Sequence, residues 1–299
     1  MQPRRFVGSA LAVGAAVVTA LAGVAGCSSG KAASPGGGGG PGGVVAPTPG
    51  PPDPVLASQV PNSYKARGSL SIAADTTYPP NEFVNGPGTI VGFDVDLGTA
   101  LAAKLGLTAH FTSVTPAVIE GGVQGGTYDL SMASWTGDKD LATKLDLVPY
   151  LAAGTKIMVA NGNPKNLAGG SATDPSACGA RIGVEVGTVQ QTDDIPARDK
   201  ACEAAGKPDV VPVASADRND LIASLQLGHS DAVLASSPVV DYYASRGMFT
   251  AVGGAYGNEP SAIIFSKNNH ALAQLFAAAL TDLKADGTYA KLAAVWGIS

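Results

Sequence analysis

The chain has 299 residues, of which 45% are hydrophobic and 14% are charged, and its formal net charge is −5. This length is enough to bury a sizeable core, either in one large domain or in two lobes of ordinary size. The mild acidity, without any run of five like charges, argues against nucleic acid or an anionic membrane surface as a partner.

Residues 1–27 follow the order charged, apolar, small that is typical of a secretory signal peptide. Arg4 and Arg5 precede an apolar run, which ends in Val24-Ala25-Gly26-Cys27. That ending resembles the bacterial lipobox, after which the cysteine is lipidated and becomes the new N-terminus. The alternative, a permanent membrane helix, fits the length of the run but not its weak, Gly/Ala-rich hydrophobicity. We therefore expect Cys27 to hold the protein on the extracytoplasmic face of the cell membrane through at least two acyl chains.

The segment that follows, residues 28–67, is predicted to be a disordered tether. Of the 20 residues from Pro35 to Pro54, 15 are Gly or Pro. Such a composition cannot bury a core, so the segment is expected only to lift the folded part off the membrane.

From residue 69 onward, short apolar strands alternate with helical patterns. Strands are predicted at 69–73, 109–113, 128–133, 156–160, 181–186, 209–213, 231–235 and 261–267. Helices are predicted at 93–105, from 116 to about 124, and at 188–205, 219–228, 237–246, 270–285 and 287–296. Two such runs in succession predict two α/β lobes with parallel sheets, whose ligands bind beyond the carboxyl ends of the strands.

Three cysteines are present, and lipidation of Cys27 leaves Cys178 and Cys202 as an even pair. In an oxidising compartment we expect a disulfide between them, closing a loop of about 25 residues and contributing roughly 3 kcal/mol. Two buried free thiols are the alternative. The three histidines are scattered without ligand spacing, so neither a metal site nor a cofactor is expected.

Six segments in order resemble the bacterial extracellular solute-binding proteins of family 3, the polar-amino-acid receptors of ABC importers. They are DTTYPPNEF (75–83), GFDVDL (92–97), YDLSMASWT (128–136), VEVGTVQQ (184–191), SDAVLASSP (230–238) and LKADGTYAKL (283–292). The resemblance implies a periplasmic-binding-protein-like fold, with one lobe from 68–157 plus 258–299 and the other from 158–257. It also implies a hinge of two crossing strands, near 156–160 and 261–267, with a ligand cleft between the lobes.

The resemblance also implies a set of ligand-binding residues. In the first lobe it points to Asp75 for a cationic group, Tyr78 for stacking, and Glu82, Ser134, Trp135 and Thr136 around the cleft. In the second lobe it points to Thr188, beside Gly187 at a helix start that donates N–H groups to a carboxylate, and to Ser236. Several have a structural alternative: a turn for Asp75, a cap or solvent exposure for Glu82, a helix cap for Thr188, and core packing for Tyr78 and Trp135. Asp94 and Asp96 are interpreted as helix N-terminal charges rather than ligands.

Three strong amino-acid contacts of the family are absent. The arginine that pairs with the ligand's α-carboxylate corresponds by counting to Leu141, and the nearby Lys139 lacks the guanidinium fork. The aspartate that holds the α-ammonium corresponds to Ser236 or Ser237, and the second aromatic residue to Pro116. The receptor class is therefore better supported by the sequence than the identity of the solute.

The predicted function is capture of a small polar solute, an amino acid or related compound, for delivery to the permease of an ABC importer by a lipid-anchored monomer. One alternative is a sensor lipoprotein that uses the same cleft for signalling. The other is a dehydratase-like enzyme on the same fold, but no GxSxG or Ser-His-Asp order supports it and no catalytic residue is assigned.

Overall fold

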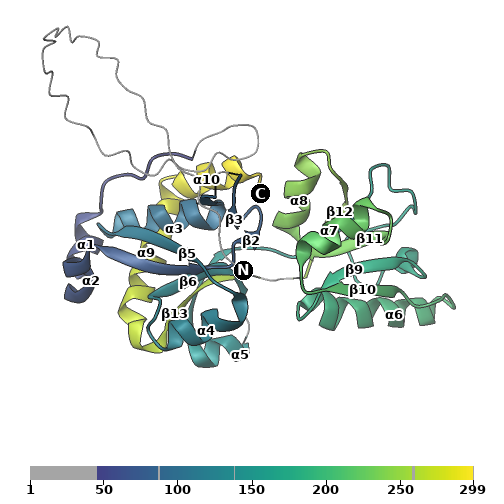
Figure 1. Cartoon of the computed structure of the whole chain (residues 1–299), viewed down its shortest axis with the longest axis horizontal. Coiled ribbons are helices and arrows are strands. Elements are labelled where there is room, and N and C mark those ends of the chain that lie inside the picture. The colour runs from purple at the N-terminus through teal and green to yellow at the C-terminus, as the bar shows by residue number, and fades with distance from the viewer. Residues whose placement is uncertain (1–45, 87, 138, 258–259, 299) are drawn as a thin grey trace, which may run out of the picture. The chain divides into compact units, whose positions relative to one another are not determined.

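A computed structural model describes residues 46–86, 88–137, 139–257 and 260–298. The predicted signal peptide with Cys27, and the first part of the predicted tether, lie outside these residues. The described residues form two five-stranded sheets and one three-stranded sheet, with helices packed on the two large sheets (Figure 1). The expected class of two α/β lobes is confirmed.

The last part of the predicted tether is folded. It forms the short helices α1 (Pro54–Gln59) and α2 (Asn62–Arg67). Leu56, Val60 and Tyr64, spaced four residues apart, are buried in the core of the first lobe. The prediction of a disordered segment up to residue 67 was therefore wrong for 54–67, because the Pro/Gly bias of the preceding residues masked this short apolar stripe.

The first large sheet has the strand order β5-β1-β6-β13-β7. Its strands are β1 (Ser69–Ala74), β5 (Thr108–Ser113), β6 (Leu130–Thr136), β7 (Leu145–Leu151) and β13 (Ser261–Ser266). Its helices are α3 (Phe93–Lys104), α4 (Pro116–Gln124), α5 (Lys139–Lys144), α9 (His270–Ala285) and α10 (Thr288–Trp296). Strand β7 was not predicted from the sequence, and it contains Pro149, which an edge strand tolerates.

Side chains of this sheet alternate between two apolar layers, as the pleat requires. Leu70 and Ile72 of β1 pack in the cluster that includes residues of α3, α9 and α10, whereas Ala73 packs in the cluster of Ile119 and Leu141 from α4 and α5. Helices therefore cover both faces of the sheet.

A small sheet connects β1 to α3. It consists of β2 (Thr77–Tyr78), β3 (Glu82–Val84) and β4 (Ile90–Val91). Gly92 ends it with a φ of 141°, and a Cβ there would lie 2.0 Å from the backbone oxygen of Asn81. Only glycine fits this close approach of two backbone segments.

The second large sheet has the strand order β10-β9-β11-β8-β12. Its strands are β8 (Thr155–Val159), β9 (Arg181–Glu185), β10 (Val211–Ser215), β11 (Ala232–Ser236) and β12 (Thr250–Tyr256). Its helices are η1 (Pro175–Ala177), the π-helix η2 (Gln190–Asp194), α6 (Ile195–Ala204), α7 (Arg218–Gln226) and α8 (Ser237–Ser245). Strand β12 was not predicted, because Gly253 and Gly254 within it are typical of a turn.

The chain passes from the first sheet to the second between Leu151 and Thr155, and it returns between Tyr256 and Ser261. Strand β8 therefore lies wholly in the second sheet, so the predicted lobe boundary at 157/158 falls inside a strand and moves to 152–154. The two passages are adjacent, since a Cβ on Gly154 would lie 2.5 Å from the backbone oxygen of Tyr256.

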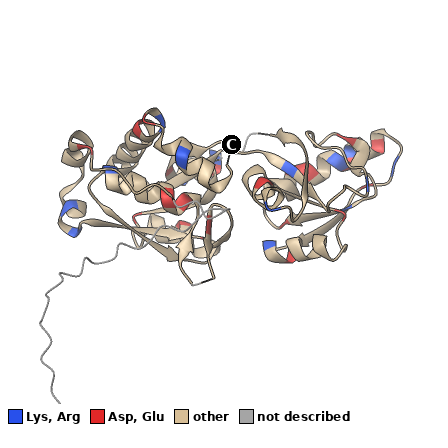
Figure 2. Cartoon of the chain, turned by 90° about the horizontal axis from the view of Figure 1, so that it is seen from above, with Lys and Arg blue, Asp and Glu red and all other residues tan. Residues whose placement is uncertain are grey.

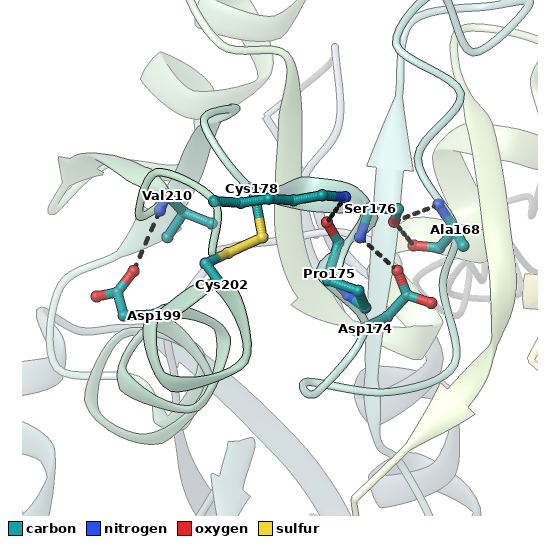
Figure 3. Close-up of a disulfide and its surroundings, with 9 residues drawn as sticks. Ala168, Asp174, Pro175, Ser176, Cys178, Asp199, Cys202 and Val210 are labelled. Atoms are coloured by element: carbon teal, nitrogen blue, oxygen red, sulfur yellow. Dashed lines mark hydrogen bonds between the residues drawn. A yellow bond between two sulfur atoms is a disulfide. The ribbon is translucent and has the colours of Figure 1, made fainter. Parts of the chain in front are cut away.

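Cys178 and Cys202 form a disulfide with their Cα atoms 5.5 Å apart, which confirms the predicted pair (Figure 3). It joins the end of η1 to α6. Cys202 is fully buried in the apolar cluster that α6 forms with β9 and β11, and Cys178 packs against that cluster. The bond therefore fixes an otherwise long connection between β8 and β9 to the body of the lobe.

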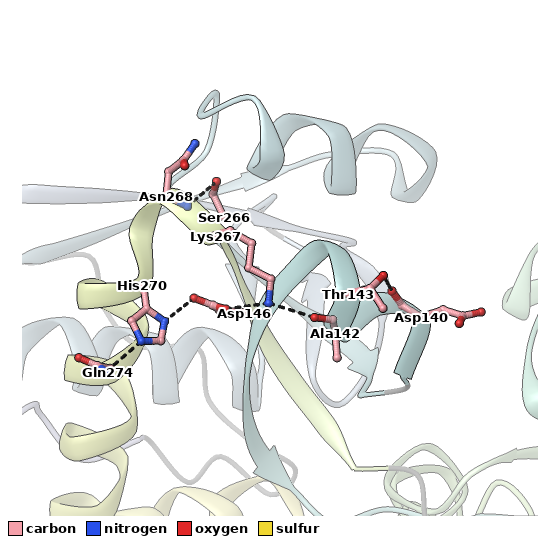
Figure 4. A network of polar contacts seen from close by, with 9 residues as sticks. All are labelled: Asp140, Ala142, Thr143, Asp146, Ser266, Lys267, Asn268, His270 and Gln274. Carbon is pink, nitrogen blue, oxygen red and sulfur yellow. Dashed lines mark hydrogen bonds and ion pairs between the residues drawn. The ribbon is translucent and has the colours of Figure 1, made fainter.

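Basic and acidic residues are interspersed along the chain in both lobes (Figure 2). One polar network joins the start of β7 to the start of α9 (Figure 4). Asp146 accepts from Lys267 Nζ at 2.9 Å, and its second oxygen lies 2.7 Å from His270 Nδ1. Lys267 and His270 lower the pKa of Asp146, although burial acts in the opposite direction, so this network fastens an exposed corner of the first lobe.

Candidate functional site

A pocket lies at the carboxyl ends of the parallel strands of the second sheet. It is lined by Tyr78, Glu185, Thr188, Gln190, Arg218, Leu221, Ile222, Val233, Leu234, Ala235, Ser236 and Val239. Strands β9 and β11 end there at Glu185 and Ser236, and α7 begins there at Arg218, as expected for a ligand site in an open α/β sheet. Its free volume is about 20 Å³, room for about one water molecule, because side chains fill it.

Arg218 is the cation of this pocket. Its guanidinium carbon lies 3.5 Å from the ring centroid of Tyr78, and its Nη2 forms an ion pair with Glu185. The Arg218 side chain is only 7% exposed. Burial raises the pKa of Tyr78 above its ordinary value, and the positive charge of Arg218 acts in the opposite direction. The arrangement is a stacked, ion-paired guanidinium of the kind that arginine favours in buried sites.

The sequence interpretation missed Arg218, although one signal was available. A cation at the first residue of a helix opposes the helix dipole, which favours acidic residues there. Asp217 caps α7 by accepting from Asn219 N at 2.8 Å, yet Arg218 follows it directly. Such an unfavourable charge just after a strand indicates a role outside the helix.

Thr188 and Ser236 both line the pocket, as their family positions imply. Thr188 Oγ1 donates to Glu185 O at 2.7 Å, so its hydroxyl fastens the turn between β9 and η2. The N–H of Gly187 donates to Gln191 Oε1 at 2.7 Å. A side-chain hydrogen bond with Ser236 lowers the pKa of Tyr78, whereas burial raises it and has the larger effect. Their ligand contacts stay predictions.

Asp75 lies in a turn. Its Oδ1 accepts from Thr77 Oγ1 at 2.9 Å and from Thr77 N at 3.3 Å, which is the turn role expected as the alternative. Asp75 also raises the pKa of Glu82, so its charge lies close to that residue. Asp75 lies beside the small sheet. Among the described residues, no Lys or Arg forms an ion pair with it.

A buried acidic cluster lies at the Ser134 turn, and its Glu82 is the cross-strand partner of Tyr78, so the cluster borders the Tyr78 pocket. Tyr150 Oη donates to Asp94 Oδ2 at 2.5 Å, and Asn81 Nδ2 donates to Ser134 Oγ at 2.6 Å. Burial, and next the neighbouring Asp94, raise the pKa of Glu82 well above its usual range. Burial also raises the pKa of Asp94 to about 6. Ser134, whose φ is 52°, donates from its Oγ to Glu82 Oε2 at 3.4 Å, so the cluster supports this turn.

Asp94 and Asp96 lie in the first turn of α3, as interpreted. Asp96 is nevertheless tied to another element, because Trp296 Nε1 donates to its Oδ2 at 2.8 Å. Burial raises the pKa of Asp96 to about 6.

The remaining first-lobe candidates do not line the Tyr78 pocket. Trp135 Nε1 donates to Ser131 Oγ at 3.0 Å, and the ring packs against the cluster of α4 and α5. Thr136 is exposed at the end of β6. Leu141, the position counted for the missing arginine, is buried in that same cluster, so it faces the core of the lobe. Counting along the sequence therefore chose a core position, because α5 begins at Lys139 and turns Leu141 inward.

No group of three histidine, cysteine, aspartate or glutamate residues within the described ranges is arranged to hold a metal ion. In the same residues, no helix is both long and apolar enough to cross a membrane. The Tyr78 pocket presents an aromatic face, a buried ion pair, two hydroxyls and an apolar floor, which are groups suited to binding a solute.

Comparisons with known proteins agree with this arrangement. A family model described as bacterial extracellular solute-binding proteins, family 3, matches residues 70–299. The chain is 32% identical over 252 residues to the arginine-binding protein ArgT of Corynebacterium glutamicum, which is 83% of this chain and 81% of that protein. It is 26% identical over 255 residues to the L-cystine-binding protein TcyJ of Escherichia coli, covering 79% of this chain and 85% of that protein. These relatives are binding proteins by name.

Solved structures show the same fold. An ancestral arginine-binding protein bound to arginine is similar with a TM-score of 0.64 and 29% identity, covering 77% of this chain and 98% of that one. The ancestral amino acid-binding protein AncCDT-1, described as a precursor of cyclohexadienyl dehydratase, is similar with a TM-score of 0.67 and 27% identity, covering 79% and 98%. Given its two α/β lobes and the match over residues 70–299, the chain belongs to the bacterial extracellular solute-binding proteins of family 3.

Proposed function

We propose that the protein captures a polar amino acid outside the cytoplasm and delivers it to the permease of an ABC importer. The observation that carries this proposal is the pocket of Tyr78, Thr188, Arg218 and Ser236 in a chain of this family. Its aromatic face, hydroxyls and ion pair suit a small solute that carries charge and hydrogen-bonding groups. Relatives named for binding arginine, L-cystine and histidine support the polar-amino-acid class.

We further propose that Cys27 is the lipid anchor. The lipobox-like ending at residue 27 supports this, and the Gly/Pro-rich residues after it would act as the spacer. Among the described residues, Ala46 already packs against the first-lobe core and Leu56 is buried in it, so the proposed spacer is shorter than the predicted 28–67. Labelled palmitate should enter the wild-type chain in its host and be absent from Cys27→Ala, which should be released from the membrane fraction. Equal labelling of both chains would contradict the anchor.

Calorimetry with a panel of cationic, acidic and neutral amino acids, amines, small carboxylates and sugars tests the proposed function. We expect micromolar or tighter binding of at least one polar amino acid. Tyr78→Ala should weaken that binding by about 10- to 100-fold, since a stacked aromatic surface is lost. Tyr128→Ala is the matched control, because Tyr128 is a half-buried tyrosine of the same lobe that packs against α4 instead.

Two results would count against the proposal. Binding of a sugar with no binding of any amino acid would exclude the amino-acid class. Normal amino-acid binding by Tyr78→Ala would move the site away from the pocket described here.

A further inference from the structure

Arg218 has binding capacity that the protein itself does not use. The Tyr78 ring covers one face of its guanidinium, and Glu185 takes Nη2. The remaining terminal nitrogen, Nη1, is buried and has no hydrogen-bond partner among the described residues. Because the side chain is only 7% exposed, water reaches this donor poorly. A buried guanidinium donor without a protein acceptor is unfavourable, so Nη1 is available to an acceptor that enters the pocket.

The surroundings of Nη1 indicate the chemistry of that acceptor. Among the described residues that line the pocket, Arg218 is the only cation and Glu185 the only acid. Thr188 and Ser236 also line the pocket, but the Thr188 hydroxyl already donates to Glu185 O, and the floor is apolar, with Leu221 and Val239. A planar guanidinium with a free, charged donor matches a carboxylate, which accepts charge-assisted hydrogen bonds.

The first lobe has no cation at Leu141, the position that corresponds to the carboxylate-binding arginine of the family. Leu141 is buried among the apolar residues of α4 and α5, and Lys139 is exposed at the start of α5. A carboxylate that enters the pocket therefore meets a buried guanidinium from the second lobe rather than from the first.

We propose that Arg218 binds the carboxylate of the solute, with Glu185 and the Tyr78 ring holding its guanidinium in place. This inference rests on the proposed capture of an amino acid and adds which residue recognises the acid group. It makes the solute a carboxylate compound, and amines or amides of the same shape poor ligands. It also places acid recognition on α7, so that a solute bound to the second lobe alone is already oriented.

The test compares an amino acid with its amide, using L-arginine and L-argininamide as probes in calorimetry on the full chain with Cys27→Ser. The wild type should prefer the acid by about 10- to 100-fold, because a charge-assisted hydrogen bond is lost with the amide. Arg218→Met should weaken acid binding and bring the ratio of the two dissociation constants close to one. Arg218→Lys should recover part of the preference, since it keeps the charge without the fork.

Two controls separate recognition from folding. Arg181→Met removes another arginine of the same lobe that pairs with an aspartate, Asp231, outside the pocket, and it should leave the ratio unchanged. The double variant Glu185→Gln, Arg218→Met avoids an unpaired carboxylate in the pocket and should show the same ratio as Arg218→Met. Melting curves of all variants confirm that each is folded.

The outcomes are distinct. A ratio that stays high in the folded Arg218→Met variant would overturn the inference and leave amino-acid capture intact. Tighter binding of both probes by that variant would also overturn it, because Arg218 would then be an occupant of the site that ligands displace. Equal affinity of the wild type for argininamide and arginine would also overturn the inference. A wild type that binds no carboxylate compound at all would overturn the proposed function together with the inference.

Discussion

Opening the disulfide between Cys178 and Cys202 should destabilise the second lobe by an amount that follows from the loop it closes. The two cysteines are 24 residues apart in the chain. In the chain-entropy model a loop of this length restricts the unfolded state by about 12 cal/mol/K, or about 3.5 kcal/mol at 25 °C. For a folded unit of this size, that corresponds to a fall in melting temperature of about 7–14 °C.

The assay is scanning calorimetry of a Cys27→Ser chain with and without a phosphine reductant. A Cys178→Ala, Cys202→Ala variant should melt at least as low as the reduced chain, because its buried Cys202 also loses sulfur packing, and reductant should not shift it further. Thiol titration of the unfolded chain without reductant should find no free thiol. A reduced chain with two titratable thiols and an unchanged melting temperature would refute the reasoning, since the loop would then be held by other contacts.

Three further substitutions probe the first lobe. Asp96→Asn keeps an acceptor for Trp296 Nε1. The pKa of Asp96 in the folded state is raised to about 6, so the folded protein binds this proton more tightly than the unfolded chain and loses stability as the pH rises. Between pH 4 and pH 7 the wild type should therefore lose about 1–2 kcal/mol more stability than the variant, measured by urea unfolding. Gly92→Ala should cost about 3 kcal/mol in the same assay, because its Cβ would lie 2.0 Å from the Asn81 backbone oxygen; an unchanged midpoint would contradict that contact. Leu141→Arg should lower stability by about 3–5 kcal/mol without improving amino-acid binding in calorimetry, whereas tighter binding would restore Leu141 as the family's arginine position.

The distribution of polar groups has a consequence for how the site works. The buried carboxyls of Glu82 and Asp94 support the Ser134 turn, whereas the pocket of Arg218 is formed almost entirely by the second lobe. Tyr78, on the small sheet, is the first-lobe residue that reaches it. If Arg218 binds the acid group of the solute as proposed, closure of the lobes would bring the Tyr78 ring onto a solute already held by the second lobe.

The sequence by itself determined the class of the protein and most of its elements. Apolar runs bounded by turn residues are local patterns, so strands β1, β9 and β11 could be predicted from the sequence alone. The pairing of Cys178 with Cys202 followed from counting cysteines in an exported chain. Two of the missed strands, β7 and β12, contain Pro149 or consecutive glycines. They form because pairing with neighbouring strands overrides the weak local preference there.

Only the tertiary structure decided which side chains share a pocket. Leu141 and Arg218 are both in helices that follow strands, and nothing local shows that the first faces the core and the second faces the ring of Tyr78. That orientation depends on where each helix begins and on how it packs against its sheet, which are contacts between residues distant in the chain. The sequence therefore identified a receptor, and the fold identified Arg218 as the cation of its pocket.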